Sequence, residues 1–108
     1  MIGTLETDMR LINDNLQKLY ALCRKHKVRK LYVFGSILTP RFNEQSDVDV
    51  LVDFNSEVNY DTYADNYFDF HHALSMLFGR DVDLVDESCV KNRYFKEELD
   101  ETKCLIYG

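Results

Sequence analysis

The sequence predicts a single domain of the α/β (α+β) class, in which a small mixed sheet of three strands is flanked by helices in the order α-β-α-β-α-β-α. Two long stretches place apolar residues at steps of three and four, which is typical of amphipathic helices. Short runs rich in β-branched and aromatic residues lie between and around them. Because the chain has 108 residues, 45% of them hydrophobic, we expect residues 1–108 to form one domain around one core.

The first half of the chain predicts a helix, a strand and a loop. The helix is expected from Leu5 to about His26, followed by a cluster of basic residues that suits a helix C-terminus. The run from Lys30 to Phe34 predicts a buried strand that ends at Gly35. From Ser36 to Gln45 the composition is polar, and we expect a short helical turn and a loop there.

The second half predicts a strand, a long helix, another strand and a final helix. The strands are expected at Asp47–Phe54 and Asp81–Asp86, on either side of a helix from Asp61 to Phe78 that Gly79 terminates. The last helix is expected from Ser88 or Asn92 to Ile106. Its expected buried side chains are Tyr94, Phe95, Leu99, Cys104 and Leu105.

This order brings several polar residues to one edge of the predicted sheet. The long helix has the length that a right-handed crossover between parallel strands needs, so Asp47 and Asp49 start at the same edge as Asp83. The first strand must run antiparallel to deliver Gly35 and Ser36 to that edge. The sequence therefore predicts a site where three strands meet, with a cluster of five acids: Asp47, Asp49, Asp81, Asp83 and Asp86.

Asp47 and Asp49 are two residues apart in a predicted strand, so their side chains share a face. Two neighbouring carboxylates repel each other unless a cation lies between them, and carboxylate oxygens suit Mg²⁺. An Asp-x-Asp tripeptide alone is weak support, since it also occurs on solvent-facing strand edges. Here the flanking residues are apolar, which favours acids at the head of a buried strand and hence a metal site.

Gly35 and Ser36 stand where the first strand ends and a helical turn begins. Glycine allows close approach of the backbone to an anion, while free amides and the serine hydroxyl can donate hydrogen bonds to phosphate. A glycine stop with a serine N-cap explains the pair in isolation equally well.

The composition disfavours several classes of function. A formal net charge of −6 argues against direct binding to a nucleic-acid backbone. The longest apolar stretches are far shorter than the roughly 20 residues of a membrane span, and the first residues do not resemble a signal peptide. We therefore expect a cytoplasmic protein with no membrane contact. The three cysteines lack zinc-site spacing.

The segment Phe34-Gly35-Ser36, followed after a gap of ten residues by Asp47-Val48-Asp49-Val50, resembles the signature of the DNA polymerase β-like nucleotidyltransferase superfamily. A third acid on a later strand belongs to that pattern, and Asp83 matches it. Within the superfamily the chain resembles the minimal nucleotidyltransferases of bacteria and archaea from about Leu19 to Tyr107. The resemblance implies the nucleotidyltransferase fold.

By this resemblance the chain is an enzyme that transfers a nucleoside monophosphate, with AMP from ATP as the expected case, to an acceptor hydroxyl. Asp47, Asp49 and Asp83 are then the catalytic residues and the ligands of two Mg²⁺ ions, and Gly35 and Ser36 hold the triphosphate. Many family members carry arginines directly after the Gly-Ser pair, where this chain has Ile37-Leu38-Thr39-Pro40. Arg41 is the candidate to replace them.

The resemblance also implies a partner. Proteins of this group often act with an all-helical HEPN protein as antitoxin and toxin, and the nucleotidyltransferase adenylylates a tyrosine of the toxin. The alternative is a non-catalytic subunit with the same fold that neutralises or regulates a partner protein. Aromatic residues in excess of one stripe on the Asp61–Phe78 helix predict a docking surface, either for such a partner or for a second copy of the chain.

Overall fold

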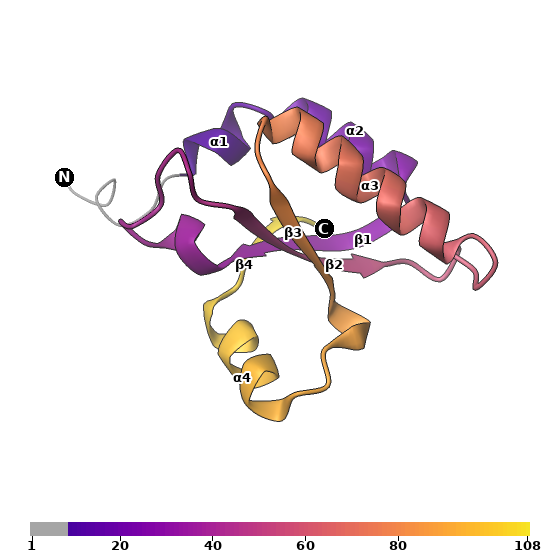
Figure 1. The fold of residues 1–108 in the computed structure, drawn as a ribbon. Helices are drawn as coiled ribbons and strands as arrows, with labels where there is room; N and C mark the ends of the chain where they lie inside the picture. Colours follow the sequence, from indigo (N-terminus) through magenta and orange to yellow (C-terminus); the bar gives the residue numbers. More distant parts are fainter. Residues whose placement is uncertain (1–8) are drawn as a thin grey trace.

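The structure is a computed structural model that describes residues 9–108. In these residues a four-stranded sheet has three α-helices on one face and one on the other (Figure 1). The helices and strands are α1 (Arg10–Asn13), α2 (Leu16–Lys25), β1 (Val28–Phe34), the 3₁₀ turn η2 (Gly35–Leu38), β2 (Val48–Phe54), α3 (Tyr63–Phe78), β3 (Val82–Asp86), the 3₁₀ turn η3 (Glu87–Cys89), α4 (Arg93–Thr102) and β4 (Cys104–Tyr107). This arrangement confirms the predicted fold class.

The first helix is interrupted, contrary to the single helix predicted from Leu5 to His26. The chain forms α1 and α2, separated by a turn at Asp14 and Asn15. The Asn15 side chain donates to the Leu11 carbonyl at 2.7 Å, while the Asn15 backbone amide donates to the Ile12 carbonyl. Asn and Asp side chains compete in this way with the helical hydrogen-bond pattern. The predicted first turn, residues 5–8, lies outside the described residues.

The sheet has the strand order β3-β2-β1-β4. As predicted, β1 and β2 are antiparallel, while β2 and β3 are parallel and joined by α3. Gly79 ends α3 in the left-handed conformation, with φ of 67°.

The fourth strand corrects the prediction of a final helix up to Ile106. The helix α4 ends at Thr102, and Lys103 is extended with ψ of 148°. The Leu105-Ile106-Tyr107 segment has high strand propensity, and β4 pairs with the free edge of β1. Of the side chains expected to be buried, Tyr94 is 75% and Leu105 49% exposed. Only Leu99 is fully buried among them, because α4 presents just one residue to the sheet.

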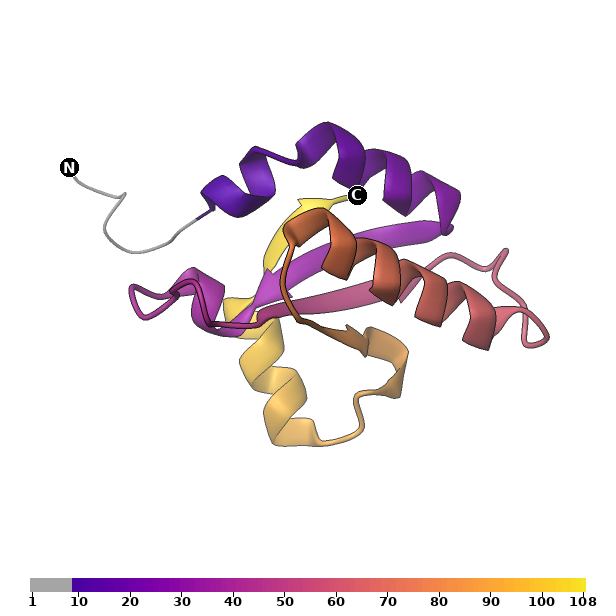
Figure 2. The ribbon, with the colours of Figure 1, turned by 45° about the horizontal axis from the view of Figure 1, so that its top comes forward.

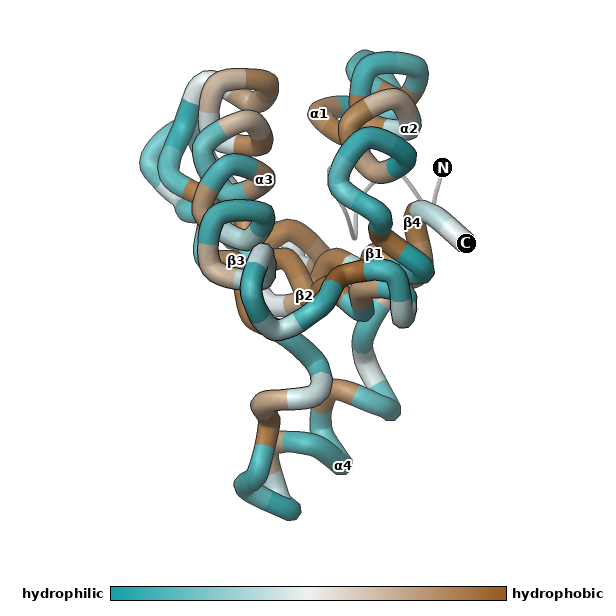
Figure 3. The backbone as a smooth tube through the Cα atoms, turned by 90° about the vertical axis from the view of Figure 1, so that its right-hand side faces the viewer, coloured by the Kyte–Doolittle hydropathy of each residue, from teal (hydrophilic) through white to brown (hydrophobic). Residues whose placement is uncertain are grey.

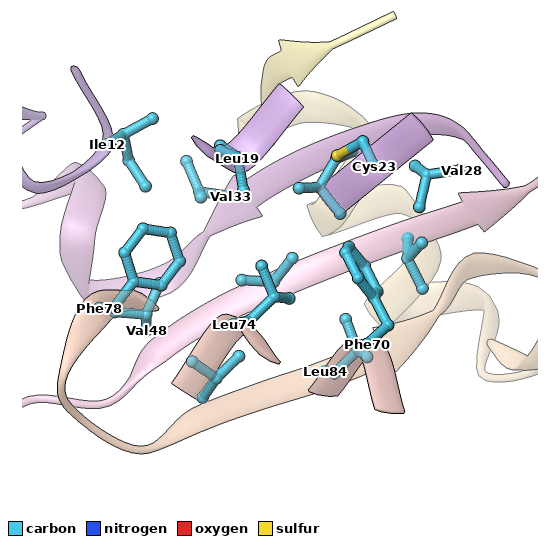
Figure 4. Close-up of a cluster of buried hydrophobic side chains, with 14 of the residues drawn as sticks. Ile12, Leu19, Cys23, Val28, Val33, Val48, Phe70, Leu74, Phe78 and Leu84 are labelled. Atoms are coloured by element: carbon cyan, nitrogen blue, oxygen red, sulfur yellow. The ribbon is translucent and has the colours of Figure 1, made fainter. Parts of the chain in front are cut away.

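The upper face of the sheet, covered by α1, α2 and α3, carries the main core (Figure 2). Most hydrophobic segments of α2 and α3 lie toward each other and the sheet, and most hydrophilic segments lie outward (Figure 3). Phe68 and Met76 of α3 are exceptions, since both are exposed. Phe70 and Leu74 of α3 meet Leu19 and Cys23 of α2 over the valines of the central strands (Figure 4).

The lower face of the sheet is covered by α4 (Figure 3). Alternate residues of β2 point to it, so that Asp49, Leu51 and Asp53 lie opposite in direction to Val48, Val50 and Val52. Leu51 is fully buried there although it lies outside the main core. Within residues 9–108 no helix combines the length and apolar character that crossing a bilayer requires.

Candidate active site

The predicted acids and the Gly-Ser pair meet at one end of the sheet. In the strand register Phe34 pairs with Asp49, and Asp49 pairs with Asp83, so these three residues form a row across β1, β2 and β3. Gly35 follows Phe34 directly, and Asp47 directly precedes β2. The topology thus brings together the residues that sequence reasoning selected.

Asp49 is the centre of this row and packs against the backbone of Gly35. A Cβ atom added at Gly35 would lie 2.2 Å from Oδ2 of Asp49, so a side chain there would collide with the carboxylate. Gly35 also has φ of 73°, which L-residues with a side chain rarely adopt. The glycine therefore serves both the turn and the close approach of the carboxylate.

Partial burial raises the pKa of the Asp49 carboxyl group, and the neighbouring Asp83 and Asp47 carboxylates raise it further. The backbone amide of Ser36 hydrogen-bonds to Asp49 and acts in the opposite direction. Asp49 is thus held between two negative groups and one amide donor. A cation bound beside it would relieve that repulsion.

Asp47 and Asp83 are exposed, whereas Asp49 is half-buried. Between residues 9 and 108 no three His, Cys, Asp or Glu side chains are gathered into a preformed metal cage. The three carboxylates are nonetheless neighbours: Asp49 pairs with Asp83 in the strand register, and both Asp83 and Asp47 raise the pKa of Asp49. They are hard oxygen donors, so the set suits Mg²⁺, which retains several waters and binds through a few carboxylates and substrate phosphates.

An open cavity of about 830 Å³ begins at the Phe34 end of this row, and Asp47, Asp49 and Asp83 are not among the residues that line it. One wall comes from the end of β1, η2 and the loop after it, and includes Gly35, Ser36 and Arg41. The other wall comes from α4. Its volume is in the range of pockets that hold small organic ligands.

The positions directly after Ser36, where many family members carry arginines, have surroundings that suit the uncharged residues of this chain. Ile37 is fully buried in the core, so a cation at that position would have to be desolvated. Leu38 and Thr39 line the cavity without charge, and Arg41 is the cation on this wall in the part of the chain that the structure describes.

Arg80 holds the loop that leads into Asp47, a role that was not predicted from the sequence. Its guanidinium donates to the carbonyls of Asn43 and Ser46, both at 2.9 Å, and lies over the Phe42 ring. These bonds tie the turn between α3 and β3 to the loop that leads into Asp47. The spacing of the sequence carries no signal for such a side chain-to-backbone contact.

Asp86 does not belong to the acidic cluster in which the sequence placed it. It ends β3, three residues beyond Asp83, so its side chain points to the opposite face of the sheet. There the buried carboxylate accepts hydrogen bonds from the Tyr63 hydroxyl and from the amide and hydroxyl of Ser88. Asp86 is therefore a structural residue.

The predicted docking surface on α3 is smaller than expected. Phe70 and Phe78 are buried in the core, and Tyr63 and Tyr67 are half-buried. Phe68 is 64% exposed and lines a pocket of about 290 Å³ with both tyrosines.

A protein-family model described as "Polymerase beta, Nucleotidyltransferase" matches residues 17–108. The protein "Putative protein adenylyltransferase MJ0128" of Methanocaldococcus jannaschii is 36% identical over 97 residues, which cover 89% of this chain and 93% of that protein.

Solved structures agree with the fold. A structure described as a "putative minimal nucleotidyltransferase" superimposes with a TM-score of 0.72 at 25% identity, and the match covers 90% of this chain and 94% of that one. A toxin-antitoxin structure with AMP-PNP gives 0.67 at 22% identity, over 87% and 73% of the two chains. A tri-AMPylated HEPN toxin in complex with MNT antitoxin, from Shewanella oneidensis, gives 0.61 at 21% identity over 89% and 71%.

Proposed function

The chain belongs to the polymerase β nucleotidyltransferase family, and from this premise we propose that it transfers AMP from ATP to a hydroxyl group of a protein acceptor. The observation that carries the proposal is the meeting of the Gly35 turn with Asp49 and Asp83 at one end of the sheet, next to an open cavity that Gly35 and Ser36 line. It combines a turn that fits a phosphate with carboxylates that fit a cation.

In the proposed reaction the acceptor hydroxyl oxygen attacks the α-phosphorus of ATP. A new P–O bond forms, the bond to the β-phosphate oxygen breaks, and pyrophosphate leaves. Asp83, which is exposed at the start of β3, accepts the hydroxyl proton as general base. Ser36 and the turn at Gly35 donate hydrogen bonds to the triphosphate, and Arg41 adds positive charge on the same wall.

Mg²⁺ would be held by Asp47, Asp49 and Asp83, and when bound it lowers the pKa of the attacking hydroxyl and neutralises the triphosphate. Arg80 keeps the loop before Asp47 in place through its bonds to two backbone carbonyls. Ser36 orients the Asp49 carboxylate through its backbone amide. Positioning of this kind accounts for most of the catalysis of phosphoryl transfer.

The proposed acceptor is a tyrosine of a HEPN-type helical protein in the cytoplasm, with this chain acting as the antitoxin. Two similarities support the choice of acceptor. The similar protein of Methanocaldococcus jannaschii carries a name that specifies protein adenylylation, and one similar structure contains an AMPylated HEPN toxin with its MNT antitoxin. The exposed ring of Phe68 on α3 offers an apolar contact for such a partner.

The experiment incubates the chain with Mg²⁺, labelled ATP and the protein encoded by the neighbouring gene, and follows the label by intact mass and peptide mapping. We expect AMP on a partner tyrosine with the wild-type chain and none with Asp49→Asn. The control is Asp53→Asn, which changes an acid on the same strand and face that pairs with Arg29 instead.

Other outcomes would change the assignment. A stable complex without any transferred label would support the non-catalytic regulatory subunit. Label on a free small molecule with an unmodified partner would contradict the protein acceptor while retaining the nucleotidyltransferase.

A further inference from the structure

The second wall of the active-site cavity comes from one face of α4. Phe95, Glu98, Leu99 and Thr102 line it, and their spacing of three and four residues places them side by side on the helix. Leu99 is buried and anchors the helix to the sheet, while the other three are exposed. This wall faces the Gly35–Ser36 turn across the cavity and has no role in the reaction described above.

Phe95 offers an aromatic surface close to the phosphate turn. Its ring is 38% exposed and meets Phe34 edge to face, with 6.2 Å between the ring centroids and 71° between the planes. This contact leaves Phe95 ring surface uncovered toward the cavity that it lines. Phe34 directly precedes Gly35, so the Phe95 ring that contacts Phe34 lies close to the Gly35–Ser36 turn. Nucleobases stack on aromatic side chains placed in this way.

Glu98 and Thr102 present hydrogen-bond acceptors to the same space. The Thr102 hydroxyl donates to the backbone carbonyl of Glu98 at 2.8 Å, so its only proton is engaged and its lone pairs remain. An ionised glutamate also accepts only. A group that binds here must therefore bring donors, which excludes phosphate and favours an amino group.

The charged groups of the cavity therefore lie on opposite walls, with Arg41 and the Gly35–Ser36 turn at one wall and a glutamate at the other. A nucleoside triphosphate matches this polarity, since its anionic end fits the first wall and an amino-bearing base fits the second. We propose that the α4 wall is the nucleobase subsite, where Phe95 stacks on the base and Glu98 accepts a hydrogen bond from its exocyclic amino group. This inference rests on the proposed function and adds the base class to it.

The test measures binding of three probes in the presence of Mg²⁺ by calorimetry. ATP carries the 6-amino group, ITP has a carbonyl oxygen there, and inorganic tripolyphosphate has no base. We expect the wild-type chain to bind ATP about tenfold more tightly than ITP, because a site built to accept from an amino group is left unpaired by the analogue.

Two variants separate stacking from hydrogen bonding. Phe95→Ala should weaken ATP and ITP alike by roughly tenfold, the effect of losing one base-aromatic stack. Glu98→Gln should bring the ATP to ITP ratio close to one, because glutamine can both donate and accept. The controls are Tyr94→Ala and Glu97→Gln, which change exposed neighbours that do not line the cavity. Both should keep the wild-type ratio, and all variants should keep the affinity for tripolyphosphate.

Unchanged ATP affinity in Phe95→Ala, or an unchanged ATP to ITP ratio in Glu98→Gln, would overturn the base subsite if tripolyphosphate still binds. Failure of the wild-type chain to bind either ATP or tripolyphosphate would instead overturn the proposed function itself. If Phe95→Ala lowers the melting temperature strongly, Phe95→Leu takes its place, since leucine retains apolar volume without an aromatic face.

Discussion

The upper and lower faces of the sheet are formed by alternate residues of the same strands, and they differ in what they bury. On the upper face Val48, Val50 and Val52 lie under α2 and α3 with no exposed surface. On the lower face Asp49 and Asp53 alternate with a single buried Leu51, and α4 covers them with one buried residue. Because successive residues of a strand point to opposite faces, β2 can place its core side chains on one face and its acidic side chains on the other.

The largest effect is expected on the lower face, for Asp47→Asn combined with Asp49→Asn. Nucleotide transfer should fall about a thousandfold or more, because the charge that binds the cation is lost. The free energy of unfolding should stay the same or rise, since the repulsion around Asp49 disappears with the charges. Initial rates and thermal melts without metal test both halves. A large drop in melting temperature would make these acids structural and remove the contrast between the faces.

The upper face should respond in the opposite way to Phe70→Ala. Phe70 is fully buried at the centre of the core, so its loss should cost about 3–5 kcal/mol of unfolding free energy. The matched control is Phe68→Ala on the same helix, where the exposed ring should cost at most about 0.5 kcal/mol. Urea denaturation of the three proteins provides the comparison. Similar losses in both variants would mean that the core does not lie where the structure places it.

Gly35 and Gly79 have nearly equal φ angles but different surroundings. Gly79 has φ of 67° and open space around an added Cβ. Gly79→Ala should therefore lower the free energy of unfolding by about 1 kcal/mol, because alanine disfavours the left-handed conformation. Gly35→Ala, with φ of 73°, should cost about 2–3 kcal/mol and also lower the transfer rate, because its Cβ displaces the Asp49 carboxylate. Denaturation curves and rates of both variants measure the difference. Equal losses would show that the contact between Gly35 and Asp49 is unimportant.

The smallest effect concerns pH and the upper face. His26 is buried, and desolvation lowers the pKa of its imidazole despite the hydrogen bond to the Asn66 side chain. The unfolded chain then binds the proton more readily, so stability should be lost as the pH falls below about 6.5, by less than about 1 kcal/mol. Unfolding at pH 7.5 and 5.5 should show this loss in the wild type and a smaller one in His26→Gln. His72→Gln, at an exposed position, should behave like the wild type.

The sequence predicted the upper face better than the lower face for a physical reason. Helical and strand periods report burial, and they located α3, β1, β2 and β3 to within two residues. The same periods failed near Cys104, where the choice between helix and strand depends on the open edge of β1 rather than on local pattern. The break at Asn15 depends on one side-chain hydrogen bond that periodicity does not reveal.

The placement of the candidate site residues was predicted in part. The proximity of Gly35, Asp49 and Asp83 follows from strand order and register, which the spacing of the motifs implies. The α4 wall could not be predicted in this way, since exposed Phe95 and Glu98 line the cavity only through the tertiary position of their helix. Asp86 was misplaced because strand alternation was ignored for a residue three positions beyond Asp83.

The alternation of β2 also determines where the chain tolerates a change in length. One residue inserted between Val48 and Phe54 would reverse the direction of every strand residue on one side of the insertion, so that acids and valines in that part of β2 would exchange faces. One residue inserted near Glu44 would lengthen an exposed loop between η2 and β2 and leave the register of every strand intact. Insertions and deletions in genes of this kind should therefore accumulate in that loop. The number of residues from Asp47 and Asp49 to the end of β2 should then stay constant, while the number from Gly35 to Asp47 varies.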